Sequence, residues 1–207
     1  MNLPYRTQTF NIGGREVQLL VPDPSAAQEQ FRSGNQTLPY WSQVWPAALG
    51  LVDFLAQNTE LIKGKKVIEL AAGLGLPSIF AASYAAHVVC SDYLEEPTWF
   101  IRESAKRNGL VNLEARILNW HHLPPDLEAE VVLLSDVNYE PSQFLVLHAV
   151  LQQLLQQGVC VLLSTPQRLS GREFITPLLY CCRHQEVIFV PHGGGDVAVN
   201  VFVLAGE

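Results

Sequence analysis

The stretch KVIELAAGLGLP, Lys66–Pro77, decides the fold of this chain. It predicts a buried strand, a tight glycine turn and the start of a helix, with the carboxylate of Glu69 at the end of the strand. A second apolar run, Val88–Ser91, leads into Asp92. A glycine turn between strand and helix lets a ligand approach the backbone closely, and an acid after the next strand suits the two hydroxyls of a ribose. Together these features predict a pocket for a nucleoside-containing cofactor.

Composition and charge favour a globular protein. The 207 residues are 48% hydrophobic and 16% charged, which suits one domain over residues 1–207 with a full core. The net charge is -7 and the 13 Lys and Arg residues are scattered. Because nucleic-acid binders usually carry a basic stripe, we expect no nucleic-acid partner.

The cysteines and the apolar runs indicate a cytoplasmic protein without a metal centre. None of the four cysteines forms a C-x-x-C pair, and they read as reduced thiols. The N-terminus has no apolar signal core, and no segment approaches the length needed to cross a bilayer. The adjacent His121 and His122 cannot share one face of a regular element and have no third ligand at suitable spacing, so a surface loop is the better interpretation.

Strand-like and helix-like segments alternate along most of the chain. Residues 5–21 predict a hairpin around Gly13-Gly14, within an N-terminal extension of residues 1–37, while residues 22–37 carry little signal. Pro46 predicts a helix start. Strands are then expected at 67–70, 88–91, 113–118, 131–135 and 159–164, and helices at 77–86, 95–107, 141–156 and 172–182.

The rhythm changes at the end of the chain. Runs 186–190 and 197–204 are strand-like with only six residues between them, so they should pair antiparallel. The predicted fold is α/β: a Rossmann-like, doubly wound sheet of seven strands, mostly parallel, with a C-terminal antiparallel hairpin and an additional N-terminal hairpin. Strand 131–135 is apolar on both faces and should be central.

This combination resembles the class I methyltransferases that use S-adenosylmethionine. Within that class, three stretches resemble the family-16 protein methyltransferases, the seven-beta-strand lysine methyltransferases. They are Trp45-Pro46-Ala47-Ala48, Leu118-Asn119-Trp120, and Ser135-Asp136-Val137-Asn138-Tyr139 with its Asp-x-x-Tyr signature. The resemblance covers roughly residues 38–204. Two positions depart from the family pattern, because Ala71 replaces the first glycine of the turn and Asn119 replaces an acid.

The resemblance implies a role for each residue of the site. Asp136 and Tyr139 would be catalytic and line the opening for a lysine amine, although Asp136 could instead cap the helix that follows. The expected cofactor-binding residues are Trp45, Glu69, Ala71, Ala72, Gly73, Asp92, Trp120 and Ser135.

Several of these cofactor roles have structural alternatives. Glu69 could reach the cofactor's amine or only hold the glycine turn. Asp92 could bind the ribose or cap the next helix, and Trp45 could close over the cofactor or plug the end of the sheet. Trp120 could pack on the adenine or in the core.

The resulting functional hypothesis is an S-adenosylmethionine-dependent methyltransferase acting on a lysine of a protein. The acidic chain would attract a locally basic partner. The alternatives are a small-molecule amine as acceptor, or a binding protein without turnover, which Ala71 and Asn119 keep open. We expect the N-terminal hairpin, the segment around Trp41 and the turn His192–Asp196 to border the edge that carries Asp136.

Overall fold

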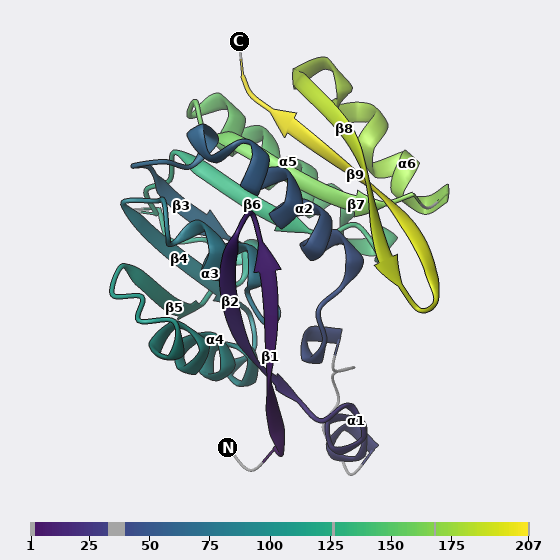
Figure 1. Ribbon diagram of the computed structural model, residues 1–207. Coiled ribbons are helices and arrows are strands. Elements are labelled where there is room, and N and C mark those ends of the chain that lie inside the picture. The colour runs from purple at the N-terminus through teal and green to yellow at the C-terminus, as the bar shows by residue number, and fades with distance from the viewer. Residues whose placement is uncertain (1–2, 33–39, 126, 168, 207) are drawn as a thin grey trace.

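The computed structural model describes residues 3–32, 40–125, 127–167 and 169–206. A seven-stranded sheet in the order β5-β4-β3-β6-β7-β9-β8 forms its centre (Figure 1). The strands are β3 (Lys66–Glu69), β4 (His87–Asp92), β5 (Leu113–Ile117), β6 (Val131–Ser135), β7 (Cys160–Pro166), β8 (Cys182–His192) and β9 (Gly195–Leu204). The predicted fold class is confirmed. Residues 33–39, which include the start of the aromatic stretch before Trp45, lie outside the described residues.

The C-terminal hairpin is inserted into the sheet in an unexpected order. Strand β9 pairs antiparallel with both β7 and β8, so β8 runs in the same direction as the five parallel strands although it forms the edge. The β7–β9 pairing ends at Pro166 opposite Val199, whereas the β8–β9 pairing continues to His192 opposite Gly195. The hairpin therefore projects beyond β7, at the edge where the parallel strands end.

Helices cover both faces of the sheet. α2 (Pro46–Gln57), α3 (Leu76–Ala81) and α4 (Glu95–Arg107) enclose one apolar core, and α5 (Phe144–Gln156) and α6 (Leu169–Ile175) enclose the other. Alternation along the strands divides the apolar side chains between these cores: Val67 packs in the first and Ile68 in the second. The predicted helix at 172–182 is instead α6 followed by the 3-10 helix η5 (Thr176–Cys181), because Pro177 cannot continue an α-helix.

The N-terminal hairpin lies on the helices, which corrects the expectation that it borders the strand ends. Its strands, β1 (Tyr5–Ile12) and β2 (Arg15–Pro22), pair antiparallel, and β2 packs on α4 (Figure 1). The amide of Leu20 donates to Ser104 Oγ at 3.0 Å. Only the open end of the hairpin reaches the strand-end edge, where the ring of Tyr5 lies 6.1 Å from that of Phe100.

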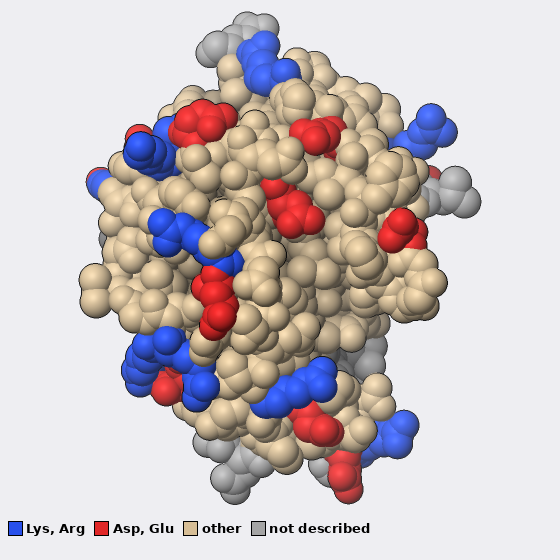
Figure 2. Space-filling view, in the orientation of Figure 1, with Lys and Arg blue, Asp and Glu red and all other residues tan. Residues whose placement is uncertain are grey.

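A helix that the sequence did not predict follows the hairpin. α1 (Pro24–Arg32) occupies the segment described as carrying little signal. Its start is marked by Asp23, whose Oδ1 accepts hydrogen bonds from the amides of Ser25 and Ala26 at 2.9 and 3.0 Å. None of the helices in the described ranges is long and apolar enough to span a membrane. On the face shown in Figure 2, charges of both signs are interspersed.

Candidate active site

The turn between β3 and α3 is built around three residues with positive φ. Gly73 and Gly75 have φ of 55° and 72°, and Ala71 has φ of 52°. A Cβ on Gly75 would lie 2.6 Å from Cys90 Sγ, and one on Gly73 would lie 3.3 Å from the carbonyl oxygen of Trp41. Packing and conformation therefore both exclude a side chain at Gly75, and at Gly73 a Cβ would be tight as well as strained. Ala71 has the conformation that costs a non-glycine residue about 1–2 kcal/mol, so the departure noted in the sequence is a strained position.

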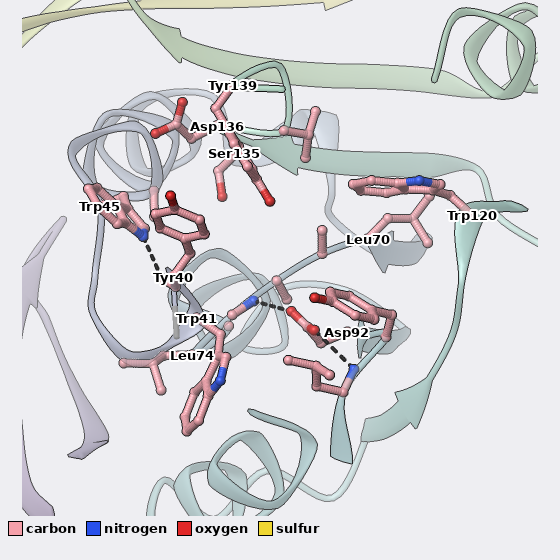
Figure 3. Close-up of a pocket in the computed structure, with 18 of the residues that line it drawn as sticks. Tyr40, Trp41, Trp45, Leu70, Leu74, Asp92, Trp120, Ser135, Asp136 and Tyr139 are labelled. Carbon is pink, nitrogen blue, oxygen red and sulfur yellow. Dashed lines mark hydrogen bonds between the residues drawn. The ribbon is translucent and has the colours of Figure 1, made fainter. Parts of the chain in front are cut away.

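Asp92 connects this turn to the end of β4. Its Oδ2 accepts a hydrogen bond from the amide of Gly73 at 3.0 Å, and its Oδ1 accepts one from the amide of Leu94 at 3.2 Å (Figure 3). The side chain is buried, and burial raises the pKa of Asp92 to about 6. The carboxylate is thus positioned by backbone donors at the floor of the pocket, with acceptor capacity remaining on both oxygens.

Glu69 lies beneath the turn and does not reach the pocket. The side chain is fully buried, and its Oε2 accepts a hydrogen bond from the amide of Ser78 in the first turn of α3 at 2.9 Å. Burial raises the pKa of Glu69 to about 8, so the carboxyl is predominantly neutral at pH 7. Of the two roles left open by the sequence, this geometry favours holding the turn.

A cavity of about 730 Å³ opens at the carboxyl ends of β3, β4 and β6. Its size is typical of a site for a cofactor or a drug-sized ligand. Apart from Glu69, every residue named as a site candidate lines it: Trp45, Ala71, Ala72, Gly73, Asp92, Trp120, Ser135, Asp136 and Tyr139 (Figure 3). The structure therefore brings together residues from five separate segments of the chain.

One end of the cavity combines an apolar wall with a few polar side chains. Trp120 and Leu70 both line it there, and the indole Nε1 of Trp120 donates to Gln143 Oε1 at 3.4 Å (Figure 3). Asn119, which replaces the acid of the family pattern, has a structural role here. Its Oδ1 accepts a hydrogen bond from the amide of His121 at 3.0 Å and caps the 3-10 helix η3 (Trp120–His122). His121 Nε2 lies 3.0 Å from Gln143 Oε1 and also lines the cavity, so this histidine is closer to the site than its assignment to a surface loop implied.

The opposite end is aromatic and open to solvent. The 3-10 helix η1 (Tyr40–Ser42) lies against the glycine turn and carries Tyr40, whose ring lies 5.4 Å from that of Tyr139 and 6.4 Å from that of Trp45. The indole Nε1 of Trp45 donates to the carbonyl oxygen of Tyr40 at 2.7 Å (Figure 3). Sequence reasoning missed Tyr40 and Gln143 as pocket residues, although the density of aromatic residues at 40–45 was a signal for the first.

Asp136, the residue directly after β6, enters the same end of the cavity. Its φ of 55° is left-handed, a conformation that Asp tolerates better than most residues, and its amide donates to the carbonyl oxygen of Ser164 at 2.9 Å. The side chain is only 8% exposed. Burial raises the pKa of the neighbouring Tyr139 to about 12, so this phenol stays neutral at physiological pH.

The solved structures that match this fold include methyltransferases. The 16S rRNA N2 G1207 methyltransferase RsmC of Thermus thermophilus, in complex with AdoMet and guanosine, matches with a TM-score of 0.65 at 17% identity, covering 100% of this chain and 52% of that one. At this identity the similarity shows the fold alone, which is that of the class I methyltransferases.

The sequence places the chain more narrowly. Residues 34–179 match the model of the lysine methyltransferase family, and the chain belongs to this family. The histone-arginine methyltransferase METTL23 of Homo sapiens is 35% identical over 144 residues, 66% of this chain and 76% of that protein. The protein-lysine N-methyltransferase EFM3 of Chaetomium thermophilum is 31% identical over 165 residues, 72% of this chain and 48% of that protein.

The matched segment spans different shares of its relatives. Across METTL23 from human, frog, mouse and rat it covers 76%, 47%, 58% and 66% of the protein. Family membership makes this protein an S-adenosylmethionine-dependent methyltransferase, which confirms the predicted enzyme class and cofactor. In the part of the chain that the structure describes, no three His, Cys, Asp or Glu side chains form a group that could hold a metal ion.

Proposed function

We propose that this protein transfers a methyl group from S-adenosylmethionine to a lysine side chain of another protein. One observation carries the choice of acceptor: the buried carboxylate of Asp136 lies beside aromatic rings at the solvent-open end of the cofactor pocket. A carboxylate and aromatic faces together suit a cationic side chain that enters from outside. The openness suits an acceptor carried by a macromolecule.

The residues of the pocket fit the cofactor. Asp92 would accept hydrogen bonds from both ribose hydroxyls, and the backbone of Ala71, Ala72 and Gly73 would border the methionine end. Trp120 would pack on the adenine, while Trp45 and Ser135 would close the pocket near the reacting centre. When bound, S-adenosylmethionine supplies an electrophilic methyl group. The chain contributes mainly positioning, which can account for a large part of the rate enhancement.

The lysine must lose a proton before it can attack. With an ordinary pKa near 10.4, deprotonation at pH 7 costs roughly 4.6 kcal/mol at 1.36 kcal/mol per unit. Asp136 does not lower this cost, because a carboxylate favours the ammonium. Its role is to capture and aim the amine, while the aromatic walls remove water and so lower the pKa of the amine. Tyr139, as a neutral phenol, can orient the amine by hydrogen bonding.

Arginine is a second candidate acceptor, supported by two observations. The relatives METTL23 are named for histone arginine, and a second acid, Glu140, lines the pocket beside Asp136. A planar guanidinium prefers bidentate carboxylate partners. However, Glu140 is exposed to solvent, where a carboxylate and a guanidinium attract each other only weakly. Of these two acids, Asp136 is buried and Glu140 is not. A single buried carboxylate favours binding of a compact cation such as an ammonium.

A direct experiment separates these acceptors and the remaining alternatives. The purified protein is incubated with labelled S-adenosylmethionine and a cell lysate, and the labelled proteins are hydrolysed to amino acids. We expect labelled methyl-lysine, and strongly reduced label with the Asp136→Asn variant. Labelled methyl-arginine would reject lysine, label confined to small molecules would show a small-molecule enzyme, and cofactor binding without transfer would show a binding protein. A cytoplasmic location, proposed from the free state of all four cysteines, is checked by cell fractionation.

A further inference from the structure

Three aromatic side chains form a wall around the opening of the pocket. Tyr40 comes from η1, Trp45 precedes α2, and Tyr139 follows β6, so three separate segments contribute one ring each. The ring centroids of Tyr40 and Tyr139 lie 5.4 Å apart, with planes tilted by 52°, and those of Tyr40 and Trp45 lie 6.4 Å apart, tilted by 53°. Tyr40 is the central ring of the group.

These rings are held at the surface rather than packed into the core. Tyr40 is 48% exposed and Tyr139 is 45% exposed. The hydrogen bond from Trp45 Nε1 to the carbonyl oxygen of Tyr40 links the segments that carry two of the rings. Asp136 also lines the pocket, and Figure 3 shows it on the same side as Tyr139 and Trp45. A half-exposed aromatic ring gives up part of the stabilisation that full burial would provide, so a packing role alone does not account for this arrangement.

An array of tilted rings beside a carboxylate has a clear chemical preference. The face of an aromatic ring attracts cations, and several rings around one space bind alkylated ammonium groups, which are bulky and weakly hydrated. A carboxylate adds charge attraction. Each methyl group on a lysine amine removes one N–H donor. A site that binds the cation through aromatic rings, and not through hydrogen bonds from those donors, does not bind more weakly as methylation proceeds.

We infer that Tyr40, Trp45 and Tyr139 form a cage for a methylated ammonium, and that Tyr40 is a specificity-determining residue of the acceptor site. This inference rests on the proposed function and deepens it: the site accepts lysine that already carries methyl groups and retains the more methylated products. The sulfonium of the cofactor is the other cation that such rings could attract, and the test must separate the two.

The test uses choline as a quaternary ammonium probe and 3,3-dimethylbutan-1-ol as its uncharged isostere. Both are titrated into the full chain loaded with S-adenosylhomocysteine, which carries no transferable methyl group, and binding is followed by the NMR signals of the tryptophan indoles. The variants are Tyr40→Leu, which removes the ring, and Tyr40→Phe, which keeps it. Tyr180→Leu is the matched control, because Tyr180 is an exposed tyrosine, at 72%, that does not line the pocket.

We expect choline to bind at least three-fold more tightly than its isostere. Tyr40→Leu should weaken choline binding by roughly three- to thirty-fold, the range expected for loss of one cation–π contact, and Tyr40→Phe and Tyr180→Leu should change it by less than about two-fold. Equal binding of the two probes, or an equal effect of Tyr180→Leu, would overturn the cage.

The affinities for S-adenosylmethionine and S-adenosylhomocysteine decide the source of the cation. If Tyr40→Leu weakens the first relative to the second and leaves choline unaffected, the rings hold the sulfonium and the inference is wrong. Circular dichroism and the affinity for S-adenosylhomocysteine show that each variant is folded. Because choline binding needs no turnover, the cage can hold while lysine methylation fails, and methylation can occur without a cage.

Discussion

The two ends of the pocket are built by different means. At the proposed cofactor end, backbone donors fix the buried acid: Asp92 is 5% exposed and is held by the amides of Gly73 and Leu94. At the acceptor end, aromatic rings stand half-exposed around Asp136. The first end suits one invariant ligand, whereas the second can change its side chains without disturbing the fold. Mutations at the two ends should therefore separate binding of the cofactor from transfer of the methyl group.

The strongest separation should come from Asp136→Asn. Asparagine keeps the size of aspartate and adopts its left-handed φ of 55° at a lower cost than alanine would. Losing the buried charge that pairs with the acceptor amine should lower kcat/KM by roughly 30- to 1,000-fold. Steady-state kinetics with the protein that the enzyme methylates would measure this loss. A comparable loss of affinity for S-adenosylmethionine, measured by isothermal titration, would place Asp136 in the cofactor end and break the comparison.

Asp92→Ala should have the opposite profile. Losing two ribose hydrogen bonds to a charged acceptor should weaken cofactor binding by about 2–4 kcal/mol. In the native protein the pKa of Asp92 is raised to about 6, and ribose hydroxyls donate to the ionised form. Affinity should thus be constant above pH 7 and fall as the pH drops through about 6. Titration calorimetry with S-adenosylmethionine from pH 5 to pH 8 measures the weaker binding of the variant and the pH dependence of the native protein. A folded variant with the native dissociation constant would refute the ribose assignment.

Glu69→Gln tests how the buried carboxyl beneath the glycine turn affects the stability of the protein. Burial raises the pKa of Glu69 from 4.5 to about 8, so its contribution to stability is complete below about pH 4.5 and is lost as the pH rises through 8. Between pH 6 and pH 8 this group should cost the native protein about 2–3 kcal/mol, at 1.36 kcal/mol per pH unit. The glutamine variant should lack this slope in urea unfolding. Glu114→Gln, at an exposed residue with a lowered pKa, should keep it. Identical slopes in all three proteins would disprove the assignment.

Ala71→Gly should produce the smallest effect. Removing a Cβ at φ 52° relieves about 1–2 kcal/mol of strain and costs about 0.5–1 kcal/mol of chain entropy, so a net stabilisation of about 0.5–1 kcal/mol is expected. Thermal unfolding should show a rise of about 1–4 °C. The control is Ala72→Gly, whose φ is not positive and which should destabilise. A loss of stability with Ala71→Gly would mean that its methyl group packs favourably.

Sequence patterns predicted the elements whose signals are local. The bounds of β6 (Val131–Ser135) and α4 (Glu95–Arg107) match the expected ones, because an apolar run bounded by polar residues fixes the first and Asn108-Gly109 ends the second. Helix α1 was missed since only Ala27 of its described side chains is buried, which leaves no apolar stripe to detect. Its capping residue, Asp23, was the available signal.

The site residues that could be predicted are those that lie in a recognisable motif at the end of a strand. Asp92, Asp136 and the glycine turn lie at strand ends, and strand ends of one direction meet at one edge. Tyr40 and Gln143 reach the pocket from segments that no short motif links to it. The orientation of Glu69 could have been inferred, because it alternates with Ile68 and so shares the face of Val67, toward α3. The roles of the individual side chains in binding and transfer remain predictions.

The N-terminal hairpin has a consequence for the order in which the molecule assembles. Its strands adjoin through Gly13-Gly14, and such a ladder closes within microseconds, although alone it is marginally stable. Its anchors on α4 are 84 and 90 residues away in the chain. The amide of Leu20 donates to Ser104 Oγ, so we expect it to find this partner only after α4 has formed. In pulsed hydrogen exchange during refolding, this amide should gain protection no earlier than the amides of α4, so the hairpin would dock on a helix that has already formed.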